Sequence, residues 1–405
     1  MILYVIGTIL IILVVGWFSK SDPQVKCGIY TQPNKWYPLK FQFLLFMLKL
    51  RRRKNEQMST ASGENAGYGV RSRSCPAEME KVQTLPPDQP KAVDAVYFNG
   101  GNKDGQFFVA ATARRQNNVV QTVLYLRLPG VGLLEIPSKP DTKLQGTDPQ
   151  AFAAGGLKLD PEDPMKVWKI SYKGKLRNHE TLEEHEVTFD LTWTAFTPYF
   201  DFDTDLHQHV MAESIAREKW SRKYFDVLKS VHQTHYEQFG EITGTVNIAG
   251  VGDKMVNVQG VRDHSYGNIR DWRYFHRYAI NYATLADKTA VCVGCISMPI
   301  TMTSLTIGYI IHPDGTKEAV SSSEFQLADH GEDGNPPKQV SFKFMAGKKE
   351  YNVTSTVQEA PIFYIGEGRD AKIHEPMCTY DINGLPGWGI SEWDYRNVPF
   401  DDGRT

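Results

Sequence analysis

The stretch VTFDLTWT at residues 187–194 decides the fold class. Apolar side chains occupy positions 187, 189, 191 and 193, and threonine or aspartate occupies the positions between them. This alternation is typical of a strand with one face in a core and the other in water. The same alternation recurs at 340–344 and 351–357. It indicates antiparallel sheet with one buried face.

Further runs of strand character follow one another along most of the chain after residue 90. Turn dipeptides such as Gly100-Gly101 and Asp333-Gly334 separate them. Short strands at this spacing are typical of sandwiches and barrels, so we expect a mostly β protein. The runs are 106–113, 119–128, 166–173, 241–249, 255–262, 278–286, 289–297, 304–311 and 318–327.

One segment interrupts this pattern. Between positions 206 and 239 there is no Gly or Pro, and Met211, Ile215 and Leu228 follow helical spacing. Thr204 or Asp205 can supply the N-cap. The segment predicts a connecting helix between two β units. The expected bounds are 91–200 for the first unit, 205–239 for the helix and 240–400 for the second unit.

The charge of the chain is unevenly distributed. The 405 residues are 41% hydrophobic and 23% charged, which is ordinary for globular proteins, and the net charge is −2. Residues 1–54 contain nine Lys or Arg and one acidic residue, a balance of +8 that leaves −10 for the remainder. An acidic body argues against nucleic acid as a partner.

Residues 2–18 carry no charge and predict a membrane anchor. As a helix the segment would be about 26 Å long, enough to cross a thin bilayer. It ends in Trp17-Phe18 rather than in the small residues of a signal-peptide cleavage site. All nearby basic residues follow it, which places the body on the cytoplasmic side. We expect a single-pass protein of the endoplasmic reticulum membrane.

Two further segments separate this anchor from the β units. Residues 41–54 end in Arg51-Arg52-Arg53-Lys54 and suit an interfacial helix on anionic lipid, although a simple spacer helix fits equally well. Residues 55–90 are rich in Ser, Gly, Asn and Pro and predict a flexible linker.

The sequence predicts no metal and no cofactor. Cys292 and Cys295 form a C-x-x-C in an apolar run without a second Cys pair, so a buried strand pair is favoured over a metal or redox site. His207 and His209 lie two apart and cannot share a helical face. The common nucleotide, zinc-protease and serine-hydrolase motifs are absent from the sequence.

Polar and aromatic residues concentrate at 260–272, between two apolar runs. In an extended chain Arg262, His264 and Tyr266 share one face, and Asp263 and Ser265 share the other. An imidazole beside a phenol and a guanidinium can transfer protons or orient a polar ligand group. From spacing alone, a structural corner held by Arg–Asp pairs is the simpler interpretation.

These residues resemble a known superfamily. The run Glu237-Gln238-Phe239-Gly240, the motif 262–267 with Arg270-Asp271-Trp272, and the run 383–389 with Glu392 look like the second half of the hydroxyneurosporene synthase (carotenoid hydratase)/AttH-like superfamily. The resemblance covers about residues 90–396. Similar segments also precede phosphoenolpyruvate-synthase-like modules in some animal proteins, but none of that machinery is visible here.

The resemblance implies two lipocalin-like antiparallel β-barrels side by side, enclosing a site for a hydrophobic ligand. It makes His264 and Tyr266 catalytic, with Tyr266 in place of the usual Trp. We expect both to line a mainly apolar pocket in the second β unit. The expected ligand-binding residues are Arg262, Trp272 and Glu392, and the expected structural residues are Asp263, Arg270 and Asp271.

Three classes of function are compatible with this resemblance. The protein could hydrate, isomerise or cyclise an apolar, isoprenoid-like or lipid-like substrate, it could bind or transfer such a ligand without chemistry, or it could be a structural adaptor. The hydratases use an acidic residue on the strand region that here spans 289–295, and that region has no acid. We therefore weigh enzyme and binding protein equally. The expected partners are an apolar small molecule and the membrane.

Overall fold

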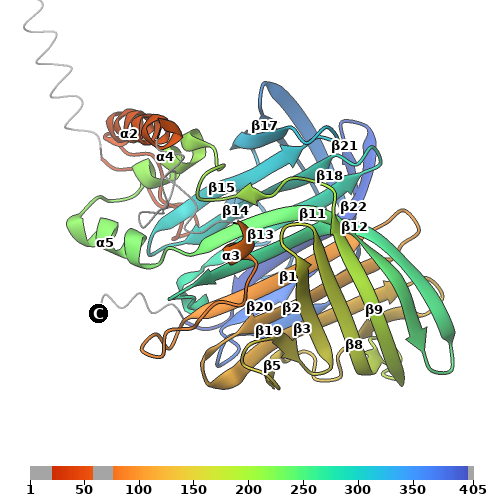
Figure 1. Ribbon diagram of the computed structural model, residues 1–405. Helices are drawn as coiled ribbons and strands as arrows, with labels where there is room; N and C mark the ends of the chain where they lie inside the picture. The colour runs from red at the N-terminus through yellow and green to blue at the C-terminus, as the bar shows by residue number, and fades with distance from the viewer. Residues whose placement is uncertain (1–20, 58–75, 400–405) are drawn as a thin grey trace, which may run out of the picture.

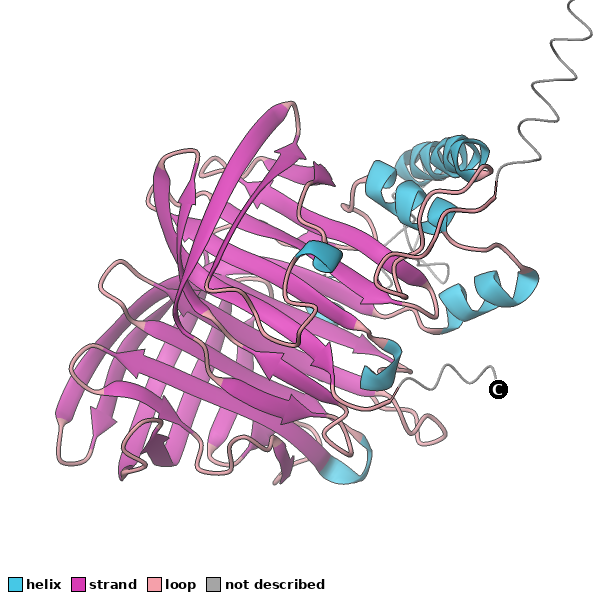
Figure 2. Cartoon of the chain, turned by 180° about the vertical axis from the view of Figure 1, so that it is seen from behind, coloured by secondary structure: helices cyan, strands magenta, loops and turns pink. Residues whose placement is uncertain are grey.

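Antiparallel strands make up most of the computed structural model, which describes residues 21–57 and 76–399 (Figure 1). Strand pairing closes them into two barrels of eight strands each. The strands dominate the view from behind, and the longer helices gather on one side (Figure 2). The mostly β class expected from the strand-like runs and the two antiparallel barrels that the resemblance implied are therefore confirmed.

The first barrel is closed by β9, which pairs with both β8 and β11. Its order around the barrel is β11-β12-β1-β2-β3-β4-β8-β9, and four short strands attach to it. The barrel strands are β1 (Val93–Gly101), β2 (Phe107–Arg114), β3 (Val119–Leu128), β4 (Gly132–Glu135), β8 (Val167–Asn178), β9 (Glu184–Ala195), β11 (Thr234–Ile248) and β12 (Gly252–Gly267); the short strands are β5 (Lys143–Gln145), β6 (Phe152–Ala154), β7 (Leu157–Asp163) and β10 (Phe200–Asp201).

The second barrel is closed by pairing between β13 and β22. Its order is β13-β14-β15-β16-β17-β18-β21-β22, and a short hairpin of β19 and β20 extends from β22. The strands are β13 (Arg277–Leu285), β14 (Ala290–Met298), β15 (Met302–Ile311), β16 (Lys317–Ser323), β17 (Gln339–Ala346), β18 (Lys349–Glu359), β19 (Ile362–Ile365), β20 (Ala371–His374), β21 (Met377–Ile382) and β22 (Leu385–Arg396).

The boundary between the barrels lies later than the sequence predicted. The long hairpin of β11 and β12 belongs to the first barrel, so the second begins at β13 rather than at residue 240. Gly240 pairs with Gly260 in this hairpin, and a Cβ on Gly240 would lie 2.3 Å from the ring of Trp193. The bare glycine therefore lets Trp193 fill the first barrel, and it ties the hairpin to that core.

The single helix expected at 205–239 is wrong. The structure has α4 (Gln208–Arg217), then α5 (Arg222–Ser230), and strand β11 already begins at Thr234. The indole nitrogen of Trp220 donates a hydrogen bond to the Ile215 carbonyl (2.9 Å) where α4 ends. The Ser221 hydroxyl accepts from the Tyr224 backbone nitrogen (3.0 Å) and caps a new helix.

The last part of the expected flexible linker is folded. A short helix, α3 (Pro76–Met79), places Met79 and Glu80 in fully buried positions. The Glu80 carboxylate accepts hydrogen bonds from Trp168 Nε1 (2.7 Å) and Arg262 Nη1 (2.7 Å) in the first barrel. Residues 58–75 of that linker lie outside the described residues.

The basic segment at 41–54 falls within a longer helix, α2 (Tyr37–Gln57), which lies beside α4 (Figure 1). None of the described helices is long and apolar enough to span a bilayer. The anchor expected at 2–18 lies outside the described residues.

Three large apolar clusters hold the described part of the molecule together. Phe98, Trp168 and Trp193 belong to the interior of the first barrel, and Trp393 belongs to the interior of the second. The third cluster joins outward-facing side chains of the two barrels, such as Tyr125 and Tyr309. This third cluster fixes the barrels against each other, and the candidate site lies within it.

Candidate functional site

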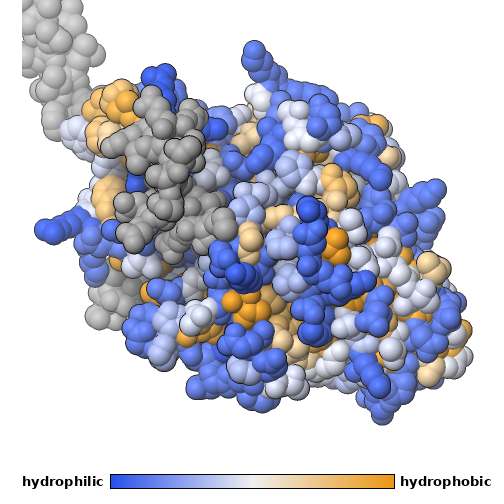
Figure 3. Space-filling view, in the orientation of Figure 1, coloured by the Kyte–Doolittle hydropathy of each residue, from blue (hydrophilic) through white to orange (hydrophobic). Residues whose placement is uncertain are grey.

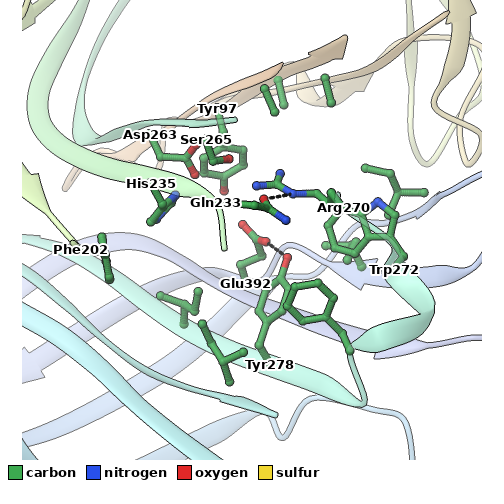
Figure 4. Close-up of a pocket in the computed structure, with 18 of the residues that line it drawn as sticks. Tyr97, Phe202, Gln233, His235, Asp263, Ser265, Arg270, Trp272, Tyr278 and Glu392 are labelled. Atoms are coloured by element: carbon green, nitrogen blue, oxygen red, sulfur yellow. Dashed lines mark hydrogen bonds between the residues drawn. The ribbon is translucent and has the colours of Figure 1, made fainter. Parts of the chain in front are cut away.

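A cavity of about 270 Å³ lies between the barrels (Figure 4). Outward-facing residues of β1, β2 and β12 form one wall, and those of β13, β15 and β22 form the other. Strand alternation sets this arrangement: Phe98 on β1 fills the first barrel, so Tyr97 points into the cavity. The pocket expected inside the second β unit is therefore an inter-barrel cavity.

Most of the cavity wall is apolar. Ile280, Leu305, Ile307, Phe363 and Trp272 all contribute to it. Its volume is near the lower end of the range of small-molecule sites, about 300–1,000 Å³. A wall of this kind favours a small apolar ligand, with the few polar groups left to orient it or to react with it.

Two carboxyl groups reach this cavity from opposite barrels. Asp263 comes from β12 and Glu392 from β22, and the Tyr278 hydroxyl donates a hydrogen bond to Glu392 (Figure 4). Burial, only partly offset by the nearby His235, raises the pKa of Asp263 to about 6. Burial, together with the negative charge of Asp263, raises the pKa of Glu392 to about 7. Burial thus brings both carboxyl groups toward the neutral range, and Glu392 holds its proton to the higher pH of the two.

A third acid, Glu375, also lines the cavity. It accepts a hydrogen bond from the Tyr97 hydroxyl (3.1 Å), which in turn accepts one from Asn99 Nδ2 (3.1 Å). Burial and the charge of Glu392 raise the pKa of Glu375 well above its usual range. Burial therefore favours the protonated form of Glu375, which extends the acidic side of the site.

A basic group stands beside Asp263. His235 Nε2 lies 3.1 Å from Glu237 Oε1, and Glu237 also accepts hydrogen bonds from Tyr282 (3.2 Å) and Tyr309 (2.7 Å). Burial disfavours the charged ring of His235, but the hydrogen bond to Glu237 and the charges of Asp263 and Glu237 outweigh it, so its pKa is raised. Protonated His235 favours the ionised form of Asp263.

A second cation completes the polar side of the cavity. Arg270 Nε donates a hydrogen bond to Gln233 Oε1 (2.8 Å), and Gln233 Nε2 donates to the Ile269 carbonyl (2.7 Å). These bonds hold the guanidinium toward the cavity (Figure 4). Arg270 can therefore orient a polar group on an otherwise apolar ligand.

Within 21–57 and 76–399, no three His, Cys, Asp or Glu side chains group as a metal site requires. Cys292 and Cys295 are buried on β14, as expected. Cys292 joins the inter-barrel cluster and Cys295 the interior of the second barrel, so the two thiols face opposite sides of the strand.

The sequence profile of one family spans nearly the whole chain: residues 3–395 match the family of unknown function DUF8627. The chain belongs to this family. No curated protein matches it.

Three solved structures resemble this DUF8627 protein in outline. An AttH-type protein from Nitrosomonas europaea is 13% identical over 79% of this chain and 98% of its own, with a TM-score of 0.47. Kievitone hydratase from Nectria haematococca is 13% identical over 82% of this chain and 96% of its own (TM-score 0.43). CghA is 11% identical over 76% of this chain and 90% of its own (TM-score 0.42). These likenesses are distant and do not extend to an activity.

The DUF8627 structure separates the two faces of the predicted motif. His264 points into the first barrel, where Nε2 lies 2.6 Å from Asp94 Oδ1 and Nδ1 lies 3.0 Å from the Tyr236 hydroxyl. The ring of Tyr266 lies 5.2 Å from that of His264. Neither residue lines the cavity, which corrects their expected position. Asp263 and Ser265, on the other face of β12, line it instead.

The remaining predicted residues divide in the same way. Arg262 is fully buried and donates hydrogen bonds to Glu80 and Gln238 inside the first barrel. It therefore does not line the cavity, contrary to the expectation that it binds the ligand. Trp272 and Glu392 line the cavity, as expected of ligand-binding residues. Asp263 and Arg270, expected at a corner, face the cavity as well. Only Asp271 stays at a corner, where it binds Arg273 and caps the turn at 272–274.

Sequence reasoning missed several groups of the site. Tyr97, Gln233 and Glu375 lie far from the motif in the sequence, and the sequence alone gives no sign that they meet. Tyr278 lies on β13, the strand that follows the motif. His235 was within reach, because it lies two positions before Glu237 of the quoted run and therefore on the same face as Glu237.

Proposed function

We propose that this protein is an acid–base enzyme that hydrates, isomerises or cyclises an apolar, unsaturated substrate held between the two barrels. The observation that carries this proposal is the pair of carboxyl groups, Asp263 and Glu392, in an apolar cavity and with pKa values that differ. Two acids whose environments separate their pKa values are typical of sites where one donates and the other accepts a proton.

The chemistry assigns a role to each carboxyl. Protonated Glu392 donates its proton to one carbon of a double bond, whose π electrons form the new C–H bond. In a hydration, water attacks the other carbon and passes its extra proton to Asp263. In a double-bond shift, Asp263 removes a proton from the adjacent carbon instead. Because Glu392 has the higher pKa, the proton then returns from Asp263 to Glu392 and restores the starting state.

The acid that the strand region at 289–295 lacks is thus available from other elements. Asp263 comes from the first barrel and Glu392 from the second, so the acid–base pair exists only where the barrels meet. Apolar walls would keep bulk water from competing for the cationic intermediate. We further propose that the reaction is of the carotenoid-hydratase type.

Isotope incorporation tests the proposal even while the substrate is unidentified. The full chain is purified with its co-purifying lipids, which are identified by mass spectrometry and returned to it in H₂¹⁸O or D₂O. Uptake of ¹⁸O together with deuterium at carbon indicates hydration, whereas deuterium at carbon without ¹⁸O indicates a double-bond shift or a cyclisation. We expect Glu392→Gln and Asp263→Asn to abolish uptake, and the exposed-acid control Glu186→Gln to leave it unchanged.

A second candidate is a protein that binds or transfers an apolar ligand without reaction. The largely apolar wall favours it, because such a wall suffices for binding. The same experiment separates the two functions. A ligand that is retained equally by wild type and Glu392→Gln, with no isotope uptake in either, contradicts the enzyme and supports the carrier.

A further inference from the structure

Helix α2 is apolar on two opposite sides. Its inner side packs Phe41, Leu44 and Leu45 against the inter-barrel cluster and buries Leu48. Its outer side leaves large apolar side chains in solvent at helical spacing: Leu39, Phe43, Phe46, Met47 and Leu50, each 44–60% exposed. A helix that is apolar all round normally has both sides covered, so this outer face lacks its cover.

This outer face is the main exposed apolar feature of the described residues. Of their twelve exposed large hydrophobic residues, six lie between positions 36 and 50. The ring of Phe43 lies 6.3 Å from that of Trp220, which lies 5.5 Å from that of the exposed Phe225 on α5. Figure 3 shows hydrophobic residues gathered at α2, next to a strongly hydrophilic group. Contiguous patches of this kind mark interaction surfaces.

Positive charge borders the patch. Lys49, Arg51 and Arg53 are exposed along the end of α2, and from 37 to 55 the helix sequence contains no acidic residue. Protein interfaces are depleted in lysine, whereas an apolar stripe bordered by Lys and Arg is typical of helices that lie in the surface of an anionic membrane.

We propose that the outer face of α2 inserts into the surface of an anionic lipid bilayer. Lys40 Nζ on α2 donates to the Glu218 carbonyl (2.6 Å), and the Glu218 carboxylate accepts from the Thr303 backbone nitrogen (2.8 Å). Thr303 follows Met302, which lines the cavity. Two hydrogen bonds therefore link α2 to the start of β15, a strand that lines the cavity. This proposal does not depend on the reaction at Asp263 and Glu392.

Photolabelling from within the bilayer tests this surface on the full chain. The protein is reconstituted into phosphatidylcholine vesicles with about one-third phosphatidylserine and a trace of lipid carrying a diazirine in its acyl chain. Labelled peptides are mapped by mass spectrometry. We expect label on the 39–50 peptide and about tenfold less in the triple variant Phe43→Ser, Phe46→Ser, Leu50→Ser.

A matched triple variant controls for lost hydrophobicity in general. Leu182→Ser, Met255→Ser and Leu385→Ser remove equally exposed apolar side chains from the barrels and should leave the α2 label unchanged. Vesicles of phosphatidylcholine alone should give severalfold less label.

Two results would overturn the proposal: no label on wild-type α2, or label on the 39–50 peptide that is equal in the wild type and in the triple variant Phe43→Ser, Phe46→Ser, Leu50→Ser. Isotope uptake in detergent would be unaffected by either of them, so failure here is distinct from failure of the proposed enzyme.

Discussion

At the scale of single residues, alternation along β12 separates two sets of ionisable groups. His264 points into the first barrel, where it bridges Asp94 and Tyr236, and it is fully buried. We expect His264→Ala to lower the free energy of unfolding by about 2–4 kcal/mol, because it leaves both buried partners without this bond. Urea denaturation of the full chain measures it, with the half-exposed His185→Ala as control. An unchanged midpoint would contradict the structural role.

Replacement of Glu392 should have the opposite effect on stability to replacement of His264. Its pKa rises from 4.5 to about 7 on folding, so the folded protein takes up this proton at higher pH than the unfolded chain. Stability from this group is complete below pH 4.5 and is lost as the pH rises through 7. Glu392→Gln should therefore raise the free energy of unfolding by about 1–3 kcal/mol relative to the wild type at pH 8. At pH 4 the two proteins should be equally stable. Thermal melts at both pH values measure this, and a destabilised variant at pH 8 would refute it.

The same two pKa values set the pH profile of turnover. Asp263 must be ionised, so the rate should fall as the pH drops below about 6, and Glu392 must be protonated, so it should fall as the pH rises above about 7. The expected profile of isotope uptake is a narrow bell. A rate that is flat from pH 5 to 8 would exclude this pair as the acid and base.

The sequence predicted where the site lies better than it predicted which side chains line it. The motif at 262–272 is where the site lies, and Trp272 and Glu392 do line it. Spacing showed that Asp263 and His264 face opposite ways, but only the position of β12 between a barrel core and the cavity decides which face meets the ligand.

At the scale of elements, short α3 has an effect out of proportion to its length. It delivers Glu80 to Arg262, Trp168 and Tyr236 inside the first barrel. Glu80→Ala leaves a buried guanidinium without its carboxylate and should cost about 3–5 kcal/mol. It should also free the segment after residue 76 for proteolysis. The exposed neighbour Glu78→Ala should do neither, and a Glu80→Ala protein that resists protease like wild type would disprove the tether.

The elements that the sequence predicted well are runs of strand character that are buried on both faces, because one face packs in a barrel interior and the other in the inter-barrel cluster. The runs 106–113, 119–128 and 289–297 became β2, β3 and β14 within one or two residues. The helix expected at 205–239 failed because pairing of β11 with β12 along the whole hairpin outweighs helical spacing after Thr234. The prediction of a flexible linker was wrong for its last part, because a Pro- and Ser-rich composition does not reveal that Glu80 is buried.

At the scale of the whole molecule, the proposals place the barrels beside a membrane with the acid–base pair between them. The orientation across that membrane rests on the basic residues that follow the segment at 2–18, and we propose a cytoplasmic body at the endoplasmic reticulum. The sequon Asn352-Val353-Thr354 reports on it, because the Asn352 side chain is exposed on β18 and the barrel would not hide a glycan. We expect Asn352 to carry no glycan in cells.

A second sequon makes that expectation decisive. The double substitution Val251→Asn, Asp253→Thr creates a second sequon. Its acceptor asparagine lies in the exposed turn between β11 and β12, outside the paired residues of the two strands. If the body is cytoplasmic, glycosidase treatment should not change the electrophoretic mobility of the wild type or of the double variant. Because both sites belong to the one body formed by the two barrels, they should agree. A glycan on either would place the barrels in the lumen, where the basic end of α2 would face a leaflet with little anionic lipid.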